Sequence, residues 1–203
     1  MRHLFIILLL LLTATSFCQS DEIYKLTFGD TSNFRLTTYL DHKRPAKFFV
    51  IDTTDTWRTE RFWLRELNEK STQVIKRMEG DEHHPYNHTY LFRDTTLDRL
   101  ISDSEKKSLS QKSGTLKSKR IALKGKNYLT VSSSRNIKGF YFVTTKPVFT
   151  SDMKYAFIDM VVFYKENLNQ DLNETYFGTI CVAYEKQQDN KWKKIKVRNH
   201  LIL

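Results

Sequence analysis

The chain has 203 residues, and its 33 Lys and Arg outnumber its 23 Asp and Glu, which gives a net charge of +10. With 40% hydrophobic residues it is long enough to bury a core without disulfides. It has only 6 glycines and lacks a Gly-rich phosphate loop, a GxSxG elbow and a Ser-His-Asp order. These absences exclude the common nucleotide-binding and serine-hydrolase motifs.

The first 18 residues have the three parts of a secretion signal. Arg2 gives a basic start, residues 4–12 form an uninterrupted apolar run, and Ser16 and Cys18 are small residues before a cut after Cys18. The run is shorter than the about 20 apolar residues that a membrane helix needs. We therefore expect a secreted or periplasmic protein whose mature chain is a single domain, residues 19–203.

An alternative is that Cys18 carries a lipid that anchors the protein in the cell envelope. The bulky Phe17 before it argues against this alternative, and a single acyl chain would anchor only weakly. Once the signal is removed, Cys181 is the one cysteine left, so no intrachain disulfide forms. A free cysteine is more often a small buried apolar residue than a nucleophile.

The charge of the mature chain favours anionic partners. Loss of Arg2 with the signal lowers the net charge from +10 to +9, which suits a glycan, a lipid headgroup or an acidic protein. No nucleic-acid partner is expected. Because the basic residues are spread along the chain, a solvated basic surface is the simpler interpretation.

The N-terminal lobe, residues 19–94, mixes helix and strand signals. The expected elements are a helix at 20–28 ended by Gly29-Asp30, a buried strand at Ala46–Asp52, a helix at Trp57–Lys70, a strand at Thr72–Met78 and a short strand at Tyr90–Phe92. Beyond this lobe, Ser102 and Glu105 have the spacing of a capping box, which predicts a helix to about Gln111. Residues 112–119 are polar and are expected to be mobile.

Residues 80–88 read as an exposed loop. The loop holds five residues that could bind zinc or copper, namely Asp81, Glu82, His83, His84 and His88. Their spacing matches no known site, so we predict no metal and no other cofactor. Asn87 and Asn173 begin glycosylation triplets, which matter only in a eukaryotic host.

The part of the chain from residue 95 to 203 predicts an antiparallel β-meander. Its strands are rich in β-branched and aromatic residues and are expected at Ile121–Ser132, Gly139–Phe149, Lys154–Tyr164, Thr175–Lys186 and Lys191–Leu201. Pro147 cannot donate to a ladder, so its strand is expected at an edge or at a bulge. A turn at Asp189-Asn190 would join the last two strands.

Side-chain alternation gives a register for the last three strands. Setting Tyr164 opposite Tyr176 makes one face wholly apolar, with the further pairs Val162–Gly178, Met160–Ile180, Ile158–Val182 and Ala156–Tyr184. The other face then pairs Val161–Thr179, Asp159–Cys181 and Tyr155–Glu185. In the last strand, Ile195 and Val197 would join the apolar face.

This register brings candidate ligand-binding residues together on the second face. Asp159 and Thr179 would lie beside a row of three cations, Lys194, Lys196 and Arg198, and Trp192 at the turn is the tryptophan expected to be exposed for stacking. One interpretation is a patch for an anionic group. The simpler one is an outer sheet face on which a neighbouring Lys or Arg neutralises Asp159, because surface ion pairs are common and weak.

The C-terminal half carries a recurring pattern. Its parts are Thr145-Lys146-Pro147-Val148-Phe149, Lys154-Tyr155-Ala156, Tyr184-Glu185-Lys186 and Asn190-Lys191-Trp192-Lys193. This pattern, over about residues 95–203, resembles small uncharacterised secreted proteins of the Bacteroidota type. Residues 167–173 replace a Cys-rich turn that many of those proteins have. The resemblance implies an exported protein but no activity, so no functional residue follows from it.

Together these features predict an α+β fold, in which an antiparallel meander of about five strands carries a few helices on one face. The expected function is a non-enzymatic, extracytoplasmic binding or envelope-associated domain with a basic surface. The alternative is an extracytoplasmic hydrolase that acts on a glycan or lipid through an unrecognised site. A carboxylate beside a His or Cys of perturbed pKa in a pocket would favour the enzyme.

Overall fold

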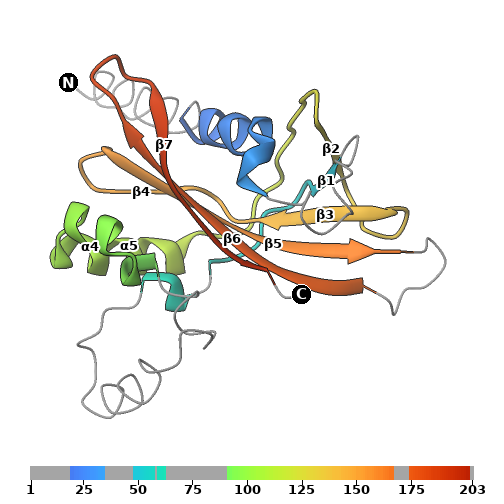
Figure 1. The fold of residues 1–203 in the computed structure, drawn as a ribbon, viewed down its shortest axis with the longest axis horizontal. Helices are drawn as coiled ribbons and strands as arrows, with labels where there is room; N and C mark the ends of the chain where they lie inside the picture. The colour runs from blue at the N-terminus through green and yellow to red at the C-terminus, as the bar shows by residue number, and fades with distance from the viewer. Residues whose placement is uncertain (1–18, 35–47, 58, 63–90, 167–173, 202–203) are drawn as a thin grey trace, which may run out of the picture.

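The computed structural model describes residues 19–34, 48–57, 59–62, 91–166 and 174–201. Outside these residues lie the secretion signal, the predicted strand Thr72–Met78, the loop at 80–88 with the first glycosylation triplet, Asn173 of the second triplet, and most of the predicted helix Trp57–Lys70. Within them the chain forms one sheet with helices packed against it (Figure 1).

The sheet has seven strands in the order β2-β1-β3-β5-β6-β7, and β4 pairs with β5 beyond the end of β3. The strands are β1 (Phe48–Ile51), β2 (Tyr128–Val131), β3 (Gly139–Thr144), β4 (Val148–Phe149), β5 (Tyr155–Lys165), β6 (Glu174–Lys186) and β7 (Trp192–Leu201). Four of the five predicted strands form an antiparallel meander, β3-β5-β6-β7, whereas the first of the five, β2, pairs with β1 instead. The sheet as a whole is mixed, because β1 runs parallel to both β2 and β3.

Helices cover both faces of the sheet, so the expectation of helices on one face was wrong. A helix at residues 19–29 and the 3-10 turn η1 (Thr31–Asn33) lie on one face, and α4 (Thr95–Leu100) and α5 (Asp103–Thr115) lie on the other (Figure 1). The physical reason is that β5 is apolar in both directions. Ile158 and Met160 enter the first core, with Phe28, whereas Phe157 enters the second core, with Leu109.

Several predicted elements differ in length or type. β2 covers only the end of the predicted strand Ile121–Ser132, and residues 91–93 form a 3-10 turn (η4, Leu91–Arg93) in place of a strand. α5 continues to Thr115, past the predicted end at Gln111. Ser102 caps it by accepting from the Glu105 amide at 3.3 Å, but the Glu105 carboxylate binds the Ser151 amide at 2.7 Å, across the gap to the β4–β5 turn.

The predicted register of β5 against β6 is confirmed over most of its length. Ala156↔Tyr184, Ile158↔Val182, Met160↔Ile180 and Val162↔Gly178 are all paired, as are the three pairs predicted for the opposite face. An irregularity between Val162 and Phe163 shifts the pairing beyond it, so Tyr164 pairs with Thr175 rather than Tyr176. A second one, between Ala183 and Tyr184, shifts β7 against β6.

That second shift divides the basic residues of β7 between the two sides of the sheet. Lys194 pairs with Tyr184 and reaches Asp30 at the end of the first helix, 2.5 Å away. Lys196 pairs with Ala183 and reaches Asp94, 2.6 Å away, whose other oxygen caps α4 through the Thr96 and Leu97 amides. Lys194 therefore connects β7 to the first helix on one face of the sheet, and Lys196 connects β7 to α4 on the other face.

Acid should weaken both ties. Burial alone would raise the pKa of Asp30 and of Asp94, but the bonds from Lys194 and Lys196 lower each below the ordinary 3.8. A carboxyl whose pKa is lower in the folded state stabilises above its unfolded pKa, and this contribution is lost as the pH falls through the folded value. We expect Lys194→Met/Lys196→Met to cost about 1 kcal/mol at pH 7, since the pairs are partly exposed.

The measurement is urea unfolding of both proteins from pH 7 to pH 2.5. The difference in unfolding free energy should shrink below about pH 4, whereas a constant difference over the whole range would contradict the assignment.

Candidate functional site

The sheet face predicted to carry a ligand is buried rather than open. Asp159 is 1% exposed, Thr179 3% and Cys181 1%, because the second core covers them. The Asp159 carboxylate accepts from the Arg61 guanidinium, with Nε and Oδ2 2.9 Å apart and both side chains 2% exposed. The prediction that a basic residue neutralises Asp159 is confirmed, but the face is not an outer surface.

The predicted row of three cations does not exist on one face. Lys194 lies on the opposite side from Lys196 and Arg198, because the shift between Ala183 and Tyr184 moves it to the first core side. Lys194 and Lys196 are each held by an aspartate. Arg198 remains where it was predicted, opposite Cys181.

Trp192 is buried, contrary to the expectation that it is exposed for stacking. Its side chain is 5% exposed and belongs to the first core, with its ring 5.7 Å from that of Phe149. The Lys186 ammonium lies over the Trp192 ring, 5.7 Å from the ring centroid. Trp192 therefore closes one end of the first core, which leaves no exposed ring at this turn for a sugar to stack on.

The buried group around Asp159 has the chemistry of a structural pair. Burial alone would lower the pKa of Arg61, but Asp159 outweighs it and raises the pKa. Burial, and then the charge of Asp159, raises the pKa of Cys181 far above the ordinary 9.0 of a thiol. Since the thiolate is the nucleophilic form, Cys181 is held protonated and inert.

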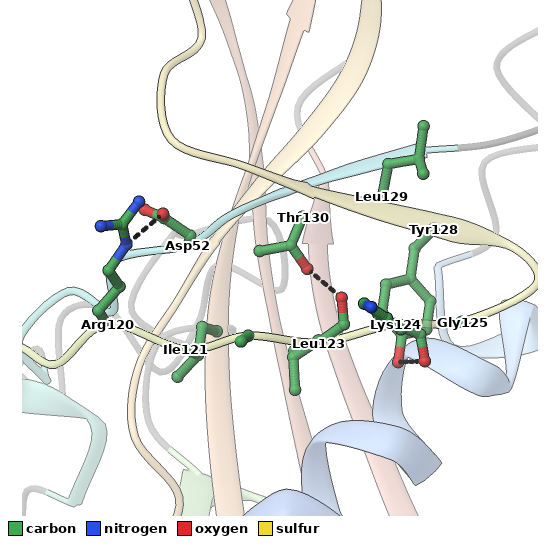
Figure 2. Close-up of a pocket in the computed structure, with 10 residues that line it drawn as sticks. Asp52, Arg120, Ile121, Leu123, Lys124, Gly125, Tyr128, Leu129 and Thr130 are labelled. Carbon is green, nitrogen blue, oxygen red and sulfur yellow. Dashed lines mark hydrogen bonds and ion pairs between the residues drawn. The ribbon is translucent and has the colours of Figure 1, made fainter.

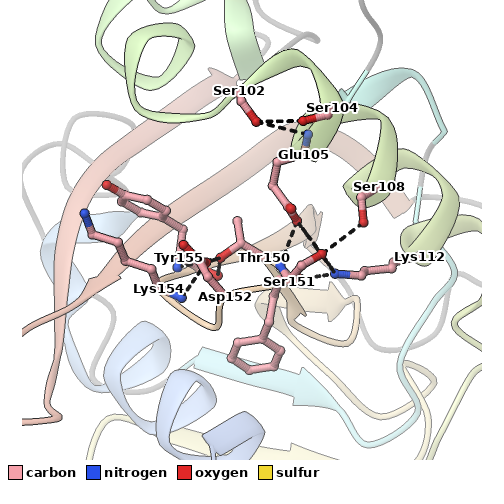
Figure 3. A network of polar contacts seen from close by, with 11 residues as sticks. Ser102, Ser104, Glu105, Ser108, Lys112, Thr150, Ser151, Asp152, Lys154 and Tyr155 are labelled. Carbon is pink, nitrogen blue, oxygen red and sulfur yellow. Dashed lines mark hydrogen bonds and ion pairs between the residues drawn. The ribbon is translucent and has the colours of Figure 1, made fainter.

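A second candidate site for catalysis is the pair formed by Ser151 and Lys112. Ser151 Oγ lies 2.9 Å from Lys112 Nζ and 3.2 Å from the Glu105 carboxylate (Figure 3). A Ser–Lys pair needs a neutral lysine to accept the serine proton. Here Lys112 also donates to the Phe149 carbonyl and lies 3.7 Å from Glu105. Because Lys112 donates to the Ser151 hydroxyl and to this carbonyl, the network fastens α5 to the β4–β5 turn.

A first hollow lies at the β2 edge of the sheet. Its volume is about 860 Å³, and it is bounded by residues 120–125 and β2 (Figure 2). Thr130 donates to the Leu123 carbonyl, and the Tyr128 ring packs so closely on Gly125 that a Cβ there would lie 2.0 Å from it. Arg120, its largest cation, is paired with Asp52 at 2.7 Å. The hollow offers few polar groups that converge on a ligand.

A second hollow, which we call the basic pocket, collects more charge. It lies where the first helix, the end of α5 and the β4 region meet, and its volume is about 660 Å³. Its lining holds four cations, Lys112, Lys119, Arg120 and Lys146, against one carboxylate, Asp21. Apolar side chains, among them Leu116, Ile121 and Phe149, complete the walls.

Lys146 is the most constrained of the four cations. The Trp57 indole donates to its carbonyl at 2.6 Å, which fixes the backbone, and Pro147 follows it. Its side chain is half-buried, and burial, together with the like charge of Lys119, lowers its pKa. Across the ranges that the structure describes, no ion pair forms at Lys146. The pocket therefore holds two cations close enough to repel each other.

Sequence reasoning missed this site. Lys119-Arg120 and Lys146 stand in separate segments, and the prediction treated residues 112–119 as a mobile polar stretch. Lys112 in fact binds the Phe149 carbonyl and Ser151, which brings this stretch against β4. The only signal in the sequence was the basic run from Lys117 to Arg120 beside the apolar residues that follow it.

Breaking the buried ion pair should be costly. Arg61→Met would leave the Asp159 charge in the second core, and we expect a loss of about 3 kcal/mol in unfolding free energy. Arg61→Met/Asp159→Leu removes both charges and should recover most of that loss. Chemical unfolding of the wild type, both single variants and the double variant gives the coupling, and a double variant as unstable as the sum of the singles would contradict a mutual pair.

Cys181 should be unreactive in the folded protein. With its pKa raised and its side chain 1% exposed, a disulfide reagent at pH 8 should modify it at least about 100-fold more slowly in buffer than in denaturant. Timed spectroscopic titration of the chain that begins at Gln19 measures this, because Cys181 is then its single thiol. Equal rates in the two conditions would show an accessible thiolate.

None of the helices within the described residues is both long and apolar enough to cross a bilayer. No group of three or more His, Cys, Asp or Glu in that part of the chain is arranged to hold a metal ion.

Comparison of the chain with protein-family models, with curated proteins and with solved structures finds no match. The resemblance of its C-terminal half to small secreted proteins of the Bacteroidota type stays a prediction.

Proposed function

We propose that the mature chain is an extracytoplasmic, non-enzymatic binding domain that holds an anionic ligand in the basic pocket. The observation that carries this proposal is the lining of the pocket, which holds four cations. Two of them, Lys112 and Arg120, lie beside Glu105 and Asp52, whereas Lys146 forms none of the ion pairs found among the described residues and lies near the like charge of Lys119. Such an excess of one charge in a hollow with apolar walls raises the local potential and attracts counter-charge.

The electrostatics of Lys146 and Lys119 support the proposal. Burial and the neighbouring ammonium both disfavour the charged form of Lys146, so the arrangement costs free energy in the empty protein. An anion placed between the two ammonium groups would remove the repulsion.

The position of the pocket also suits a binding site. Three of its walls come from firmly fastened elements: α5 is tied to the β4–β5 turn by Glu105 and Lys112, and Tyr24 of the first helix donates to the Thr145 carbonyl at 3.3 Å. A site built on such elements needs little reordering when a ligand enters.

The alternative, an extracytoplasmic hydrolase, has less to support it. The feature that would favour an enzyme is a carboxylate beside a His or Cys in a pocket. Neither His nor Cys is found among the described residues that line the basic pocket, and Cys181 is buried elsewhere with a raised pKa. Binding without chemistry therefore remains the proposal.

Reversal of the two repelling charges should abolish retention. We expect Lys119→Glu/Lys146→Glu to bind immobilised heparin, or vesicles rich in phosphatidylglycerol, at least about tenfold more weakly than the wild type, since each such factor corresponds to about 1.4 kcal/mol. Measurement at several salt concentrations should show the loss to be largest at low salt.

The matched control is Lys138→Glu/Lys193→Glu, which changes the net charge by the same amount at exposed lysines outside the pocket. It should retain most of the wild-type affinity. An equal loss in both double variants would mean that binding follows net charge alone, and no retention of the wild type at low salt would overturn the proposal.

A further inference from the structure

We infer that the ligand of the basic pocket is an amphiphile, a single anionic head group on an acyl chain, with the chain inside the pocket. This inference rests on the proposed function and specifies the ligand class. Its starting point is that the pocket is lined by two kinds of surface, one cationic and one apolar.

The apolar lining and the charged lining differ in exposure. Ile121 is 8% exposed and Val148 2% exposed, and Pro147 is also buried, whereas Lys119 and Arg120 are exposed and Lys146 is half-buried. The exposed cations are therefore open to an anion from solvent, and partly covered apolar side chains lie in the same pocket. This combination suits an amphiphile.

A purely hydrophilic anion would leave the inner wall unused. Inorganic phosphate or a sulfated sugar could pair with the lysines, but Leu116, Phe149 and Met153, which are all half-buried along the pocket, would keep their remaining contact with water. An alkyl chain laid against them gains about fourfold in affinity for each methylene that it buries. The volume of about 660 Å³ lies within the usual size of small-molecule pockets.

The charge pattern also selects the head group. The cations that line the pocket come from three segments, α5, residues 119–120 and residue 146. Of these, Lys119 lies close enough to Lys146 for its charge to lower the pKa of Lys146, so a compact anion such as a phosphate monoester or a carboxylate suits this pair. A neutral head group would leave the repulsion between Lys119 and Lys146 in place and bind less well.

The test uses the mature protein and dodecyl phosphate below its micelle concentration, measured by calorimetry. We expect one molecule per chain, bound at least about 100-fold more tightly than inorganic phosphate and at least about tenfold more tightly than dodecyl maltoside, which has the same chain on an uncharged head. Vesicles that contain phosphatidic acid form a further arm. Stronger binding of the free amphiphile than of the vesicles indicates a soluble ligand, and the reverse indicates a membrane lipid as its source.

A bulky substitution separates this inference from the proposed function. Thr115 lines the pocket from the end of α5, so the indole of Thr115→Trp should fill part of the pocket. We expect this variant to bind dodecyl phosphate at least about tenfold more weakly, while its retention on heparin stays unchanged. Gln111→Trp, on the exposed side of the same helix and outside the pocket lining, is the matched control and should leave both unchanged.

The outcomes are distinguishable. Equal affinity for dodecyl phosphate and inorganic phosphate, or an unchanged affinity of Thr115→Trp for the amphiphile, would overturn the inference that the pocket binds an acyl chain. The proposed anion site would still stand. Failure of the wild type to bind any of the anions, heparin included, would overturn the proposed function with it.

Discussion

The pairing of β5 with β6 is the interaction on which the rest of the structure depends. Both strands are apolar toward both sides, so each face must be covered, and the chain covers them with elements from different places. Residues 19–34 close one face, and the η3 turn (Thr59–Phe62) with α4 and α5 closes the other. The basic pocket lies where these two layers approach each other at β4, because Pro147 separates β4 from β3 and leaves that margin of the sheet irregular.

The alternation of side chains was enough to predict how β5 and β6 pair, but not where the pairing shifts. The predicted pairs hold from Tyr155 to Val162 because each places an apolar side chain on a buried face. A bulge adds one residue on one strand and reverses the alternation beyond it. Nothing in the residue types around Ala183 marks such a place, so Lys194 was assigned to the wrong side. The irregularity after Val162 likewise changed the partner of Tyr164, although Tyr164 packs against the first core as predicted.

The covering of the second face could have been predicted from the alternation along β5 and β6. Phe157, Cys181 and Ala183 alternate with the core residues of the first face, so an outer surface there would have exposed an aromatic ring and two small apolar side chains. What misled the interpretation was Asp159, read as a sign of solvent. The ion pair with Arg61 makes its burial tolerable, and Arg61 stands almost 100 residues earlier, where no local pattern connects the two. Long-range pairs of this kind are invisible to periodicity.

The basic pocket was out of reach for a different reason. Its cations become significant only through their proximity, and proximity arises from how α5 docks on the β4–β5 turn through Glu105 and Lys112 (Figure 3). A fold under selection for stability alone gains nothing from setting Lys146 half-buried beside Lys119, because an acidic or neutral residue at either position would relieve the repulsion. Local departures from the rules of stability occur where a site must meet something else. That reasoning makes the repelling lysines, rather than the total charge of the chain, the argument for a ligand of opposite sign.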